Sequence, residues 1–312
     1  MGIVLPFELD VEMRMYHNKS FPLGIIKANI DDYDIWLCNK LIDCVYQDGT
    51  FDSVEEDIWS VRDGLTFNQN MWLAPETFAK KGFDLITFNK SMLDEGFYIT
   101  GSYNEFYIPC KRPYKNFDFN HDYVIFGYDS NSFKSAAYME DSKYGLFDLK
   151  FEDYFQGVVK NTPQKTGLNF HKIKERYSPH INIDLIKSKL QSYLNSPIDA
   201  QGRIYGIAAW DKLSDYILNN INIDLRFSRA FMEHRKIMSK RISKLNELSY
   251  INNKELVDEY YTNVYLKAEI VHNLFIKYYL TKDLHISQRA ANLILVINST
   301  EKELINAFLE EI

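Results

Sequence analysis

The chain has 312 residues and a formal net charge of −7, and its 36 Lys and Arg residues are dispersed along the sequence. A nucleic-acid-binding protein gathers basic residues on one surface, so this pattern argues against a nucleic-acid partner. No stretch of about 18 uninterrupted apolar residues occurs, which argues against a transmembrane helix, and we expect no contact with a membrane.

The beginning of the chain predicts two elements before any strand. Residues 20–30 are expected to form a helix that starts at Ser20, a typical capping residue, with Pro22 in the first turn. Residues 34–47 continue with helical periodicity, which places Cys38 on an apolar stripe. The Asp48-Gly49 turn is expected to end this second helix.

A β-rich stretch follows in the sequence. Strands are expected at 97–100 and 105–108, and then a hairpin whose turn lies at residues 129–131. Residues 144–158 are expected to add one more strand and a short helix. The fold class predicted from this pattern is α+β, with an antiparallel sheet in the first half of the chain.

The second half of the chain changes to helical periodicity throughout. The polar stretch Lys160–Asn169 contains a proline and a glycine, and it suggests a domain boundary. We therefore expect an α+β domain over residues 1–165 and an all-helical domain over residues 166–312. The five expected helices cover residues 182–194, 206–219, 225–248, 254–280 and 287–309.

The number and spacing of the cysteines, together with the N-terminal sequence, suggest where in the cell the protein is located. The three cysteines have no CxxC spacing and form no even disulfide framework, and the N-terminus MGIVLPFELDVEMRM lacks the features of a signal peptide. We expect a cytoplasmic protein with reduced thiols. The chain also lacks GxGxxG, Walker A, HExxH and GxSxG motifs, and we expect neither a metal nor a cofactor.

His121 is the first candidate site residue. It opens the apolar run HDYVIFGYD, where a strand would hold its backbone while its ring faces a cleft. An imidazole titrates near pH 6.5, which suits a general base at neutral pH. The structural alternative is a half-exposed histidine hydrogen-bonded to a neighbour.

The candidate nucleophiles each have a structural alternative. Cys38 lies on the apolar stripe of a helix, where packing explains it as well as catalysis does, and Cys110 at a strand end has no obvious role. Ser20 can cap a helix instead of attacking a substrate. Glu233 and His234 either line a groove or belong to ion pairs within their own helix.

Three stretches together resemble a known family. They are EFYIPCKRPYKNFDFNHDYVIFGYD, YGLFDLKFEDY and, further along, IYGIAAWDKLSDYI with DLRFSRAFMEHRKIMSKRISKL. This arrangement is similar to the N-terminal domain of butirosin biosynthesis protein H, a family of papain-like acyltransferases from natural-product gene clusters. The amide-forming cysteine-protease homologue of closthioamide assembly is related in idea. The likeness is loose over the first hundred residues and better from Glu105 onward.

The resemblance implies a papain-like fold with a helical domain after it, and a reaction. Such enzymes move an acyl group from an acyl or peptidyl carrier-protein thioester, through a cysteine, to a small-molecule amine or peptide, in nonribosomal antibiotic biosynthesis. His121 fits the family's histidine position. The nucleophile position at the helix start holds Ser20, so Cys38 is the alternative. The third position falls near Ala136, which leaves Asp141 or Glu140 as a shifted substitute.

Two functions remain open from the sequence. In one, the chain is an acyltransferase or amide-bond-forming enzyme that pairs His121 with Cys38 or Ser20, with Asp141 as the third group. In the other, it is a non-catalytic relative that binds a peptide, a carrier protein or a product.

Overall fold

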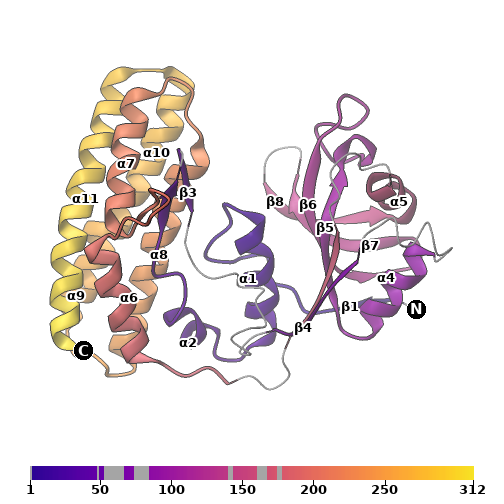
Figure 1. The fold of residues 1–312 in the computed structure, drawn as a ribbon, viewed down its shortest axis with the longest axis horizontal. Helices are drawn as coiled ribbons and strands as arrows, with labels where there is room; N and C mark the ends of the chain where they lie inside the picture. Colours follow the sequence, from indigo (N-terminus) through magenta and orange to yellow (C-terminus); the bar gives the residue numbers. More distant parts are fainter. Residues whose placement is uncertain are drawn as a thin grey trace. The chain divides into compact units, whose positions relative to one another are not determined.

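The computed structural model describes residues 2–47, 49–52, 67–73, 84–139, 143–159, 167–173 and 178–312. The chain divides into two compact units, and each of them is built from two separate segments (Figure 1). We call Met1–Asp31 with Asp57–Ser178 the sheet unit, and Asp32–Glu56 with Pro179–Ile312 the helical unit. The α+β class expected from the sequence describes this chain.

An antiparallel sheet forms the centre of the sheet unit. Its strands pair in the order β4-β9-β5-β6-β7-β8, and β1 pairs with β6. The strands are β1 (Ile3–Val4), β4 (Phe67–Leu73), β5 (Tyr98–Asn104), β6 (Asn120–Tyr128), β7 (Ser132–Tyr138), β8 (Tyr144–Lys150) and β9 (Leu168–Ile173). The expected hairpin is confirmed, because β6 and β7 pair on either side of residues 129–131.

Two helices cover one face of this sheet. They are α4 (Leu85–Asp94) and α5 (Phe151–Val159), and both contribute to an aromatic-rich core with β5, β6 and β9 (Figure 1). Tyr103 and Tyr123 stack within this core with ring centroids 4.9 Å apart. The hydroxyl groups of Tyr123 and Tyr154 lie 3.1 Å apart, and Asn89 donates to Tyr154, so these buried phenols have polar partners.

A third helix, α1 (His17–Asn29), belongs to the same unit. It begins three residues before Ser20, so the expected helix start at Ser20 was wrong, and Ser20 makes no cap. Pro22 lies inside the helix rather than in its first turn. Gly24 allows the N-terminal segment to cross α1 closely, since a Cβ atom there would lie 2.6 Å from the carbonyl oxygen of Glu8.

The stretch after β5 differs from the expectation. Residues 105–108 do not form a strand; a short 3₁₀ helix, η1 (Glu105–Tyr107), begins there instead. The side chain of Asn104 caps it by accepting the N–H of Phe106 at 3.0 Å. An asparagine at the end of a strand can bond to nearby backbone N–H groups in place of the next sheet hydrogen bonds, and the chain then turns. The apolar periodicity of the sequence does not reveal such a cap.

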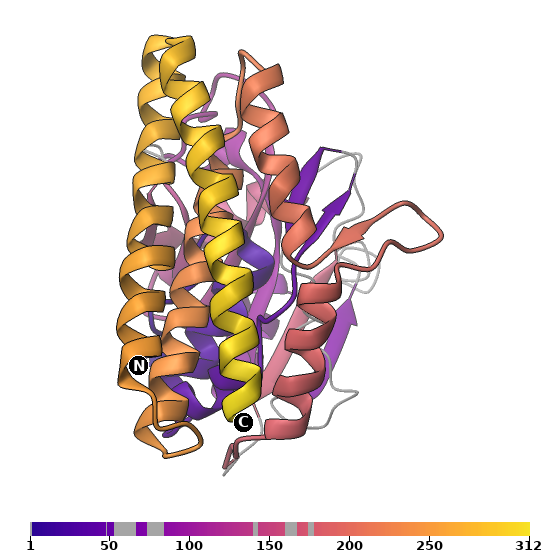
Figure 2. The same ribbon diagram turned by 90° about the vertical axis from the view of Figure 1, so that its left-hand side faces the viewer.

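Long helices make up most of the helical unit. They are α6 (Ile183–Asn195), α7 (Ile207–Asn219), α8 (Leu225–Glu247), α9 (Lys254–Glu259), α10 (Leu266–Thr281) and α11 (Leu284–Glu311). A π-helical turn, η2 (Tyr260–Tyr265), joins α9 to α10. Figure 2 shows α10 and α11 side by side. The five expected helices are confirmed, with α9, η2 and α10 forming the fourth.

The segment Asp32–Glu56 belongs to the helical unit and not to the sheet unit. Its helix α2 (Tyr33–Cys38) ends at Cys38, so the helix expected over residues 34–47 was too long. Leu41 has a positive φ of 56°, which interrupts the helix. The strands β2 (Val45–Gln47) and β3 (Thr50–Asp52) pair with each other, and β10 (Ile204–Tyr205) pairs with β2.

These units do not follow the boundary expected after residue 165. Strand β9 pairs with β4 and β5, which keeps the sheet unit continuous to Ser178. Arg241 on α8 donates to the carbonyl oxygens of Cys38 at 2.8 Å and Lys40 at 2.5 Å, and thereby holds α2 in the helical unit. Such contacts join residues that are far apart in the sequence, so the composition of a single stretch does not predict them.

Candidate functional site

The candidate site lies in the sheet unit, where β6 and η1 meet. His121 is the second residue of β6 and pairs in register with Tyr103 of β5. Glu105 follows β5 directly, and its N–H donates to the carbonyl oxygen of Phe119 at 2.7 Å. This register brings Oε1 of Glu105 to 2.9 Å from Nδ1 of His121. We call His17, Glu105, Lys111, His121 and Tyr138 the two-histidine site.

Glu105 shares its charge between two basic groups. Its side chain is only 6% exposed, and Nζ of Lys111 lies 3.5 Å from Oε1. The Lys111 ammonium also donates to the carbonyl oxygen of Tyr138. Burial lowers the pKa of Lys111, and the Glu105 carboxylate opposes this shift. The carboxylate thus has a cation on one side and an imidazole on the other.

His17 brings a second imidazole to the same place. It is the first residue of α1, and its ring centroid lies 4.6 Å from that of His121 and 4.9 Å from that of Tyr138. Burial lowers the pKa of His17 to about 2, and the neighbouring His121 and Lys111 add to the shift. His17 is therefore neutral, and its buried Nε2 has no hydrogen-bond partner among the described residues.

His121 is the more accessible of the two imidazoles. Its side chain is 30% exposed, and its ring lies edge-on to Phe119 at 5.4 Å. When ionised Glu105 accepts the Nδ1–H, a neutral His121 ring carries its lone pair on Nε2. This is the arrangement of a general base whose tautomer is held by a carboxylate.

Asn104 holds the loop that carries Glu105. Its Oδ1 accepts the N–H groups of Phe106 at 3.0 Å and Phe119 at 3.3 Å, and its Nδ2 donates to Asp118 at 2.7 Å. The side chain therefore ties the start of η1 to the segment that leads into β6. Such secondary contacts keep a catalytic carboxylate in position.

Ser20 is enclosed in the sheet unit. It is the fourth residue of α1, is fully buried, and its Oγ has no hydrogen bond of standard geometry among the described residues. The Ser20 hydroxyl interacts with the phenol of Tyr144. Burial raises the pKa of that phenol, and the Ser20 hydroxyl offsets part of the rise. A substrate cannot reach a hydroxyl enclosed in this way without rearrangement of α1.

The thiols are poor nucleophiles where they lie. Cys38 is the last residue of α2 in the helical unit, it is 2% exposed, and burial raises its pKa to about 11. A reactive thiolate is favoured at a helix N-terminus and not at a C-terminus. Cys110 is half-buried against the core of the sheet unit, and burial raises its pKa as well.

The residues expected at the third position are Asp141, Glu140 and the neighbourhood of Ala136. Asp141 and Glu140 lie outside the described residues. Ala136, near the expected third position, is buried on β7. Among the described residues, the carboxylate partner of His121 is Glu105, which precedes it by sixteen positions. The sequence pattern places Glu105 at the start of a strand, so it gives no sign of this contact.

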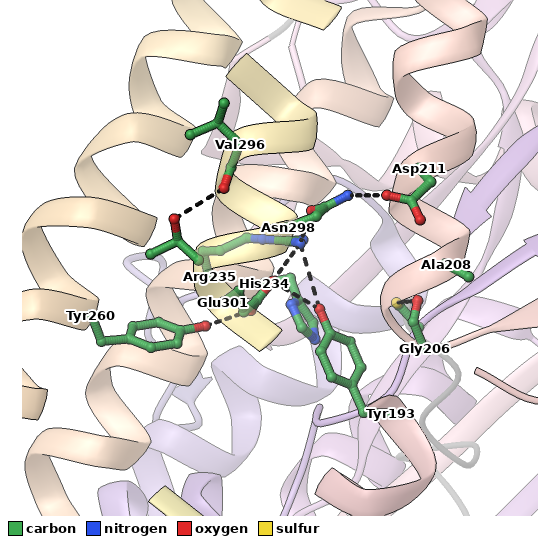
Figure 3. Close-up of polar contacts among 12 residues, drawn as sticks. Tyr193, Gly206, Ala208, Asp211, His234, Arg235, Tyr260, Val296, Asn298 and Glu301 are labelled. Atoms are coloured by element: carbon green, nitrogen blue, oxygen red, sulfur yellow. Dashed lines mark hydrogen bonds and ion pairs between the residues drawn. The ribbon is translucent and has the colours of Figure 1, made fainter. Parts of the chain in front are cut away.

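A second polar group of residues lies inside the helical unit. Arg235 donates to Glu301 at 2.7 Å and to Asn298 at 3.0 Å, and both charged side chains are fully buried (Figure 3). Tyr260 and Tyr193 also donate to Glu301. All the hydrogen bonds of Arg235 to these groups come from Nη2, and its guanidinium lies 3.9 Å from the centroid of the Phe231 ring. We assign this network to the internal packing of the helices.

The histidine and glutamate singled out on α8 have partners within the helical unit. Glu233 accepts from Arg229 at 2.8 Å, one turn away, as the ion-pair alternative predicted. His234 is buried, and its Nε2 lies 2.9 Å from the carbonyl oxygen of Ile42. Burial lowers the pKa of His234 to about 3, so the ring is neutral and donates this bond.

Comparison with protein-family models and with curated proteins finds no match to this chain. In the described part of the chain, no three His, Cys, Asp or Glu side chains are grouped so that they could hold a metal ion. None of the described helices is long and apolar enough to cross a membrane.

Proposed function

We propose that the sheet unit is an acyltransferase domain in which His121 acts as the general base. The donor is the thioester of an acyl or peptidyl carrier protein, and the acceptor is a small-molecule amine or a peptide amine. The observation that carries this proposal is the contact of 2.9 Å between Glu105 and Nδ1 of His121, beside a partly exposed ring. The resemblance described above supplies the substrate class.

The reaction proceeds by direct attack in this proposal. Nε2 of His121 takes a proton from the acceptor amine while the amine nitrogen bonds to the thioester carbon. The C–S bond then breaks, and the departing thiolate takes the proton back from the imidazolium. Glu105 stabilises the imidazolium between these two steps.

Direct attack suits the groups that are present. A thioester is already an activated acyl donor, so a covalent acyl-enzyme is not required. Ser20 and Cys38 are buried, and the pKa of Cys38 is raised, which makes both of them poor nucleophiles.

Helix α1 begins beside the His121 ring, and the N–H groups of Lys19 and Ser20 donate to the carbonyl oxygen of Tyr16. The N–H groups of His17 and Asn18 precede the first intrahelical bonds. These groups can stabilise the oxyanion that forms on the thioester oxygen.

The papain-like architecture is part of the same proposal. A helix whose first turn faces a histidine near the start of a strand, within an antiparallel sheet, is the order that the resemblance implies. In this chain the helix start presents His17 in place of a cysteine. We also propose a cytoplasmic location, since all three cysteines are free thiols.

The test uses an acyl-N-acetylcysteamine thioester with a panel of primary amines. Amide formation is followed by mass spectrometry for the wild type, for His121→Asn and for the control His285→Asn, whose side chain is exposed on α11. We expect His121→Asn to lower the rate by at least ~10²-fold, and His285→Asn to leave it unchanged.

Intact-mass analysis during the same reaction separates the two chemical routes. The proposal predicts no acyl adduct on the protein. An adduct that maps to Ser20, Cys38 or Cys110 would replace direct attack by a covalent route. Tight binding of thioester or amine without any turnover would favour the non-catalytic alternative.

A further inference from the structure

A pocket of about 440 Å³ lies within the helical unit, among α2, α8, α9 and η2. Its volume falls in the range of small-molecule sites, roughly 300–1,000 Å³. Leu37, Cys38 and Val257 supply its apolar lining, and the first two of these are buried. The proposed acyl transfer assigns no role to this pocket.

One wall of the pocket is a row of lysines on α8. Lys236, Lys240 and Lys244 are spaced four residues apart, so they lie on one face of the helix. Like charges at this spacing repel each other unless anions offset them. Glu247 pairs with Lys244 at 2.8 Å. Lys236 is partly buried in this wall and makes no hydrogen bond or ion pair with the part of the chain that the structure describes.

The opposite wall carries two tyrosines on the π-helical turn. The rings of Tyr261 and Tyr265 lie 5.6 Å apart, and both residues line the pocket. The Tyr265 hydroxyl donates to Glu269 at 2.6 Å, which holds its ring in place. A π-helical turn inside a helix is rare and occurs often at functional sites. Here the turn places both tyrosines in the lining of the same pocket as the row of lysines.

The acidic groups of the pocket lining leave Lys236 available to a ligand. Asp34 and Asp258 are exposed, and Glu247 is engaged with Lys244. Arg241 is not available to a ligand, since it donates to the carbonyl oxygens of Cys38 and Lys40. The cation most able to accept a new partner is therefore Lys236, with the hydroxyl of Ser239 as a neighbouring donor on the pocket wall.

We infer that this pocket binds a phosphate monoester with an organic body. The phosphate lies against Lys236 and the hydroxyl of Ser239, and the lysine acts as a point charge for a compact anion. The organic part lies against Tyr261, Tyr265 and the apolar lining. A phosphate suits this wall better than a carboxylate, because three oxygens can meet an ammonium and a hydroxyl together.

The test uses phenyl phosphate as the probe and isothermal titration calorimetry on the full chain. Inorganic phosphate, phenol and benzoate are titrated in parallel. We expect phenyl phosphate to bind more tightly than each of the three. Lys236→Ala should weaken its binding by at least about tenfold, the loss of one charged hydrogen bond. Tyr261→Ala should weaken it by roughly two- to tenfold.

Two variants serve as matched controls. Lys212→Ala removes an exposed lysine of α7, and Tyr279→Ala removes an exposed tyrosine of α10. Both should bind phenyl phosphate as the wild type does. Equal binding by Lys236→Ala and the wild type would overturn the site. Benzoate binding as tight as that of phenyl phosphate would overturn the phosphate assignment, and equal binding of inorganic phosphate would overturn the role of the tyrosines.

Discussion

Glu105 and Lys111 are both buried side chains that lie in contact beside His121. The ammonium of Lys111 lies 3.5 Å from the carboxylate, and the imidazole lies 2.9 Å from it. These two contacts give the Glu105 carboxyl group a basic partner on either side. In the proposed mechanism, Glu105 accepts the Nδ1–H of His121, so that Nε2 faces the substrate.

Replacing Glu105 tests this arrangement. Glu105→Gln keeps the size of the side chain but removes the charge that stabilises the imidazolium. We expect the aminolysis rate of the thioester to fall by ~10–10²-fold. Glu152→Gln, on the exposed side of α5, is the control with the same chemical change. A variant that retains the full rate would show that His121 does not depend on Glu105.

The buried pair in the helical unit gives a second prediction at this scale. Glu301→Ala leaves the Arg235 guanidinium in the interior without its carboxylate, which should cost about 3–5 kcal/mol of unfolding free energy. Lys212→Ala, in the exposed pair with Asp215, should cost at most about 1 kcal/mol. Denaturant unfolding measures both. Equal losses for the two variants would contradict a structural role for the buried network.

The place of His121 near the start of a strand could be predicted from the sequence, but its side-chain contacts could not. A histidine that opens an apolar strand is visible as a local pattern, and the structure places His121 near the start of β6. Glu105 and His17 approach it only through the β5–β6 register and the position of α1, which are long-range features. The resemblance points to Ser20 at the nucleophile position and to Cys38 as its alternative. Both side chains are buried, which the sequence does not show directly and which makes both poor nucleophiles.

At the scale of elements, α1 carries the residue that faces His121, so its position matters for the site. The helix is crossed by the N-terminal segment at Gly24, where the N–H of Glu8 donates to the carbonyl oxygen of Gly24 at 3.0 Å. A Cβ atom at Gly24 would lie 2.8 Å from the ring of Phe7 as well as close to the Glu8 backbone. The crossing therefore depends on the absence of a side chain.

Gly24→Ala separates helix propensity from packing. Propensity alone predicts a gain of about 1 kcal/mol for alanine over glycine inside a helix. The close approach of the Glu8 backbone predicts the opposite sign, a loss of roughly 1–3 kcal/mol. Gly157→Ala in α5 is the milder comparison, since its nearest neighbours are side-chain atoms at 3.2 Å. A more stable Gly24→Ala protein would contradict the observed crossing.

Helical elements were predicted better than irregular ones. The helices from α6 to α11 follow the apolar period closely, because each buries one stripe over many turns. The helix expected over residues 34–47 stops at Cys38, and residues 105–107 turn into a 3₁₀ helix. Both differences arise from single residues with special backbone or capping roles, Leu41 and Asn104, which periodicity does not detect.

At the scale of the whole molecule, each unit is assembled from two separate stretches of chain. The segment Asp32–Glu56 interrupts the sheet unit in sequence and packs with α8 in the helical unit. A boundary drawn from composition places one break along the chain, and three breaks are required here. The two candidate sites lie in different units, so a variant in one should leave the other unchanged.

Buried histidines link the stability of the molecule to pH. Burial lowers the pKa of His17 to about 2 and the pKa values of His171 and His234 to about 3. In the unfolded chain each titrates near 6.5, so the unfolded state binds more protons below that pH. The unfolding free energy should therefore be unaffected above pH 6.5 and fall below it, by about 1.4 kcal/mol per pH unit for each histidine.

Denaturant unfolding between pH 7.5 and pH 4.5 checks this dependence. His171→Gln removes one titrating group while it keeps a polar partner for Thr100, which lies 2.9 Å from the ring. Below pH 6.5, the unfolding free energy of the variant should fall less steeply with decreasing pH than that of the wild type. The difference in slope should correspond to one proton fewer taken up on unfolding. A slope equal to that of the wild type would mean that His171 is protonated in the folded state.

The most direct test of the central claim is chemical rescue of the base. In His121→Ala the partly exposed ring is removed, and added imidazole can enter the space beside Glu105. We predict a thioester aminolysis rate at least ~10²-fold below that of the wild type, with partial recovery as imidazole is added and no acyl adduct on the protein. A His121→Ala protein that turns over at the wild-type rate without imidazole would contradict the assignment of His121 as the general base.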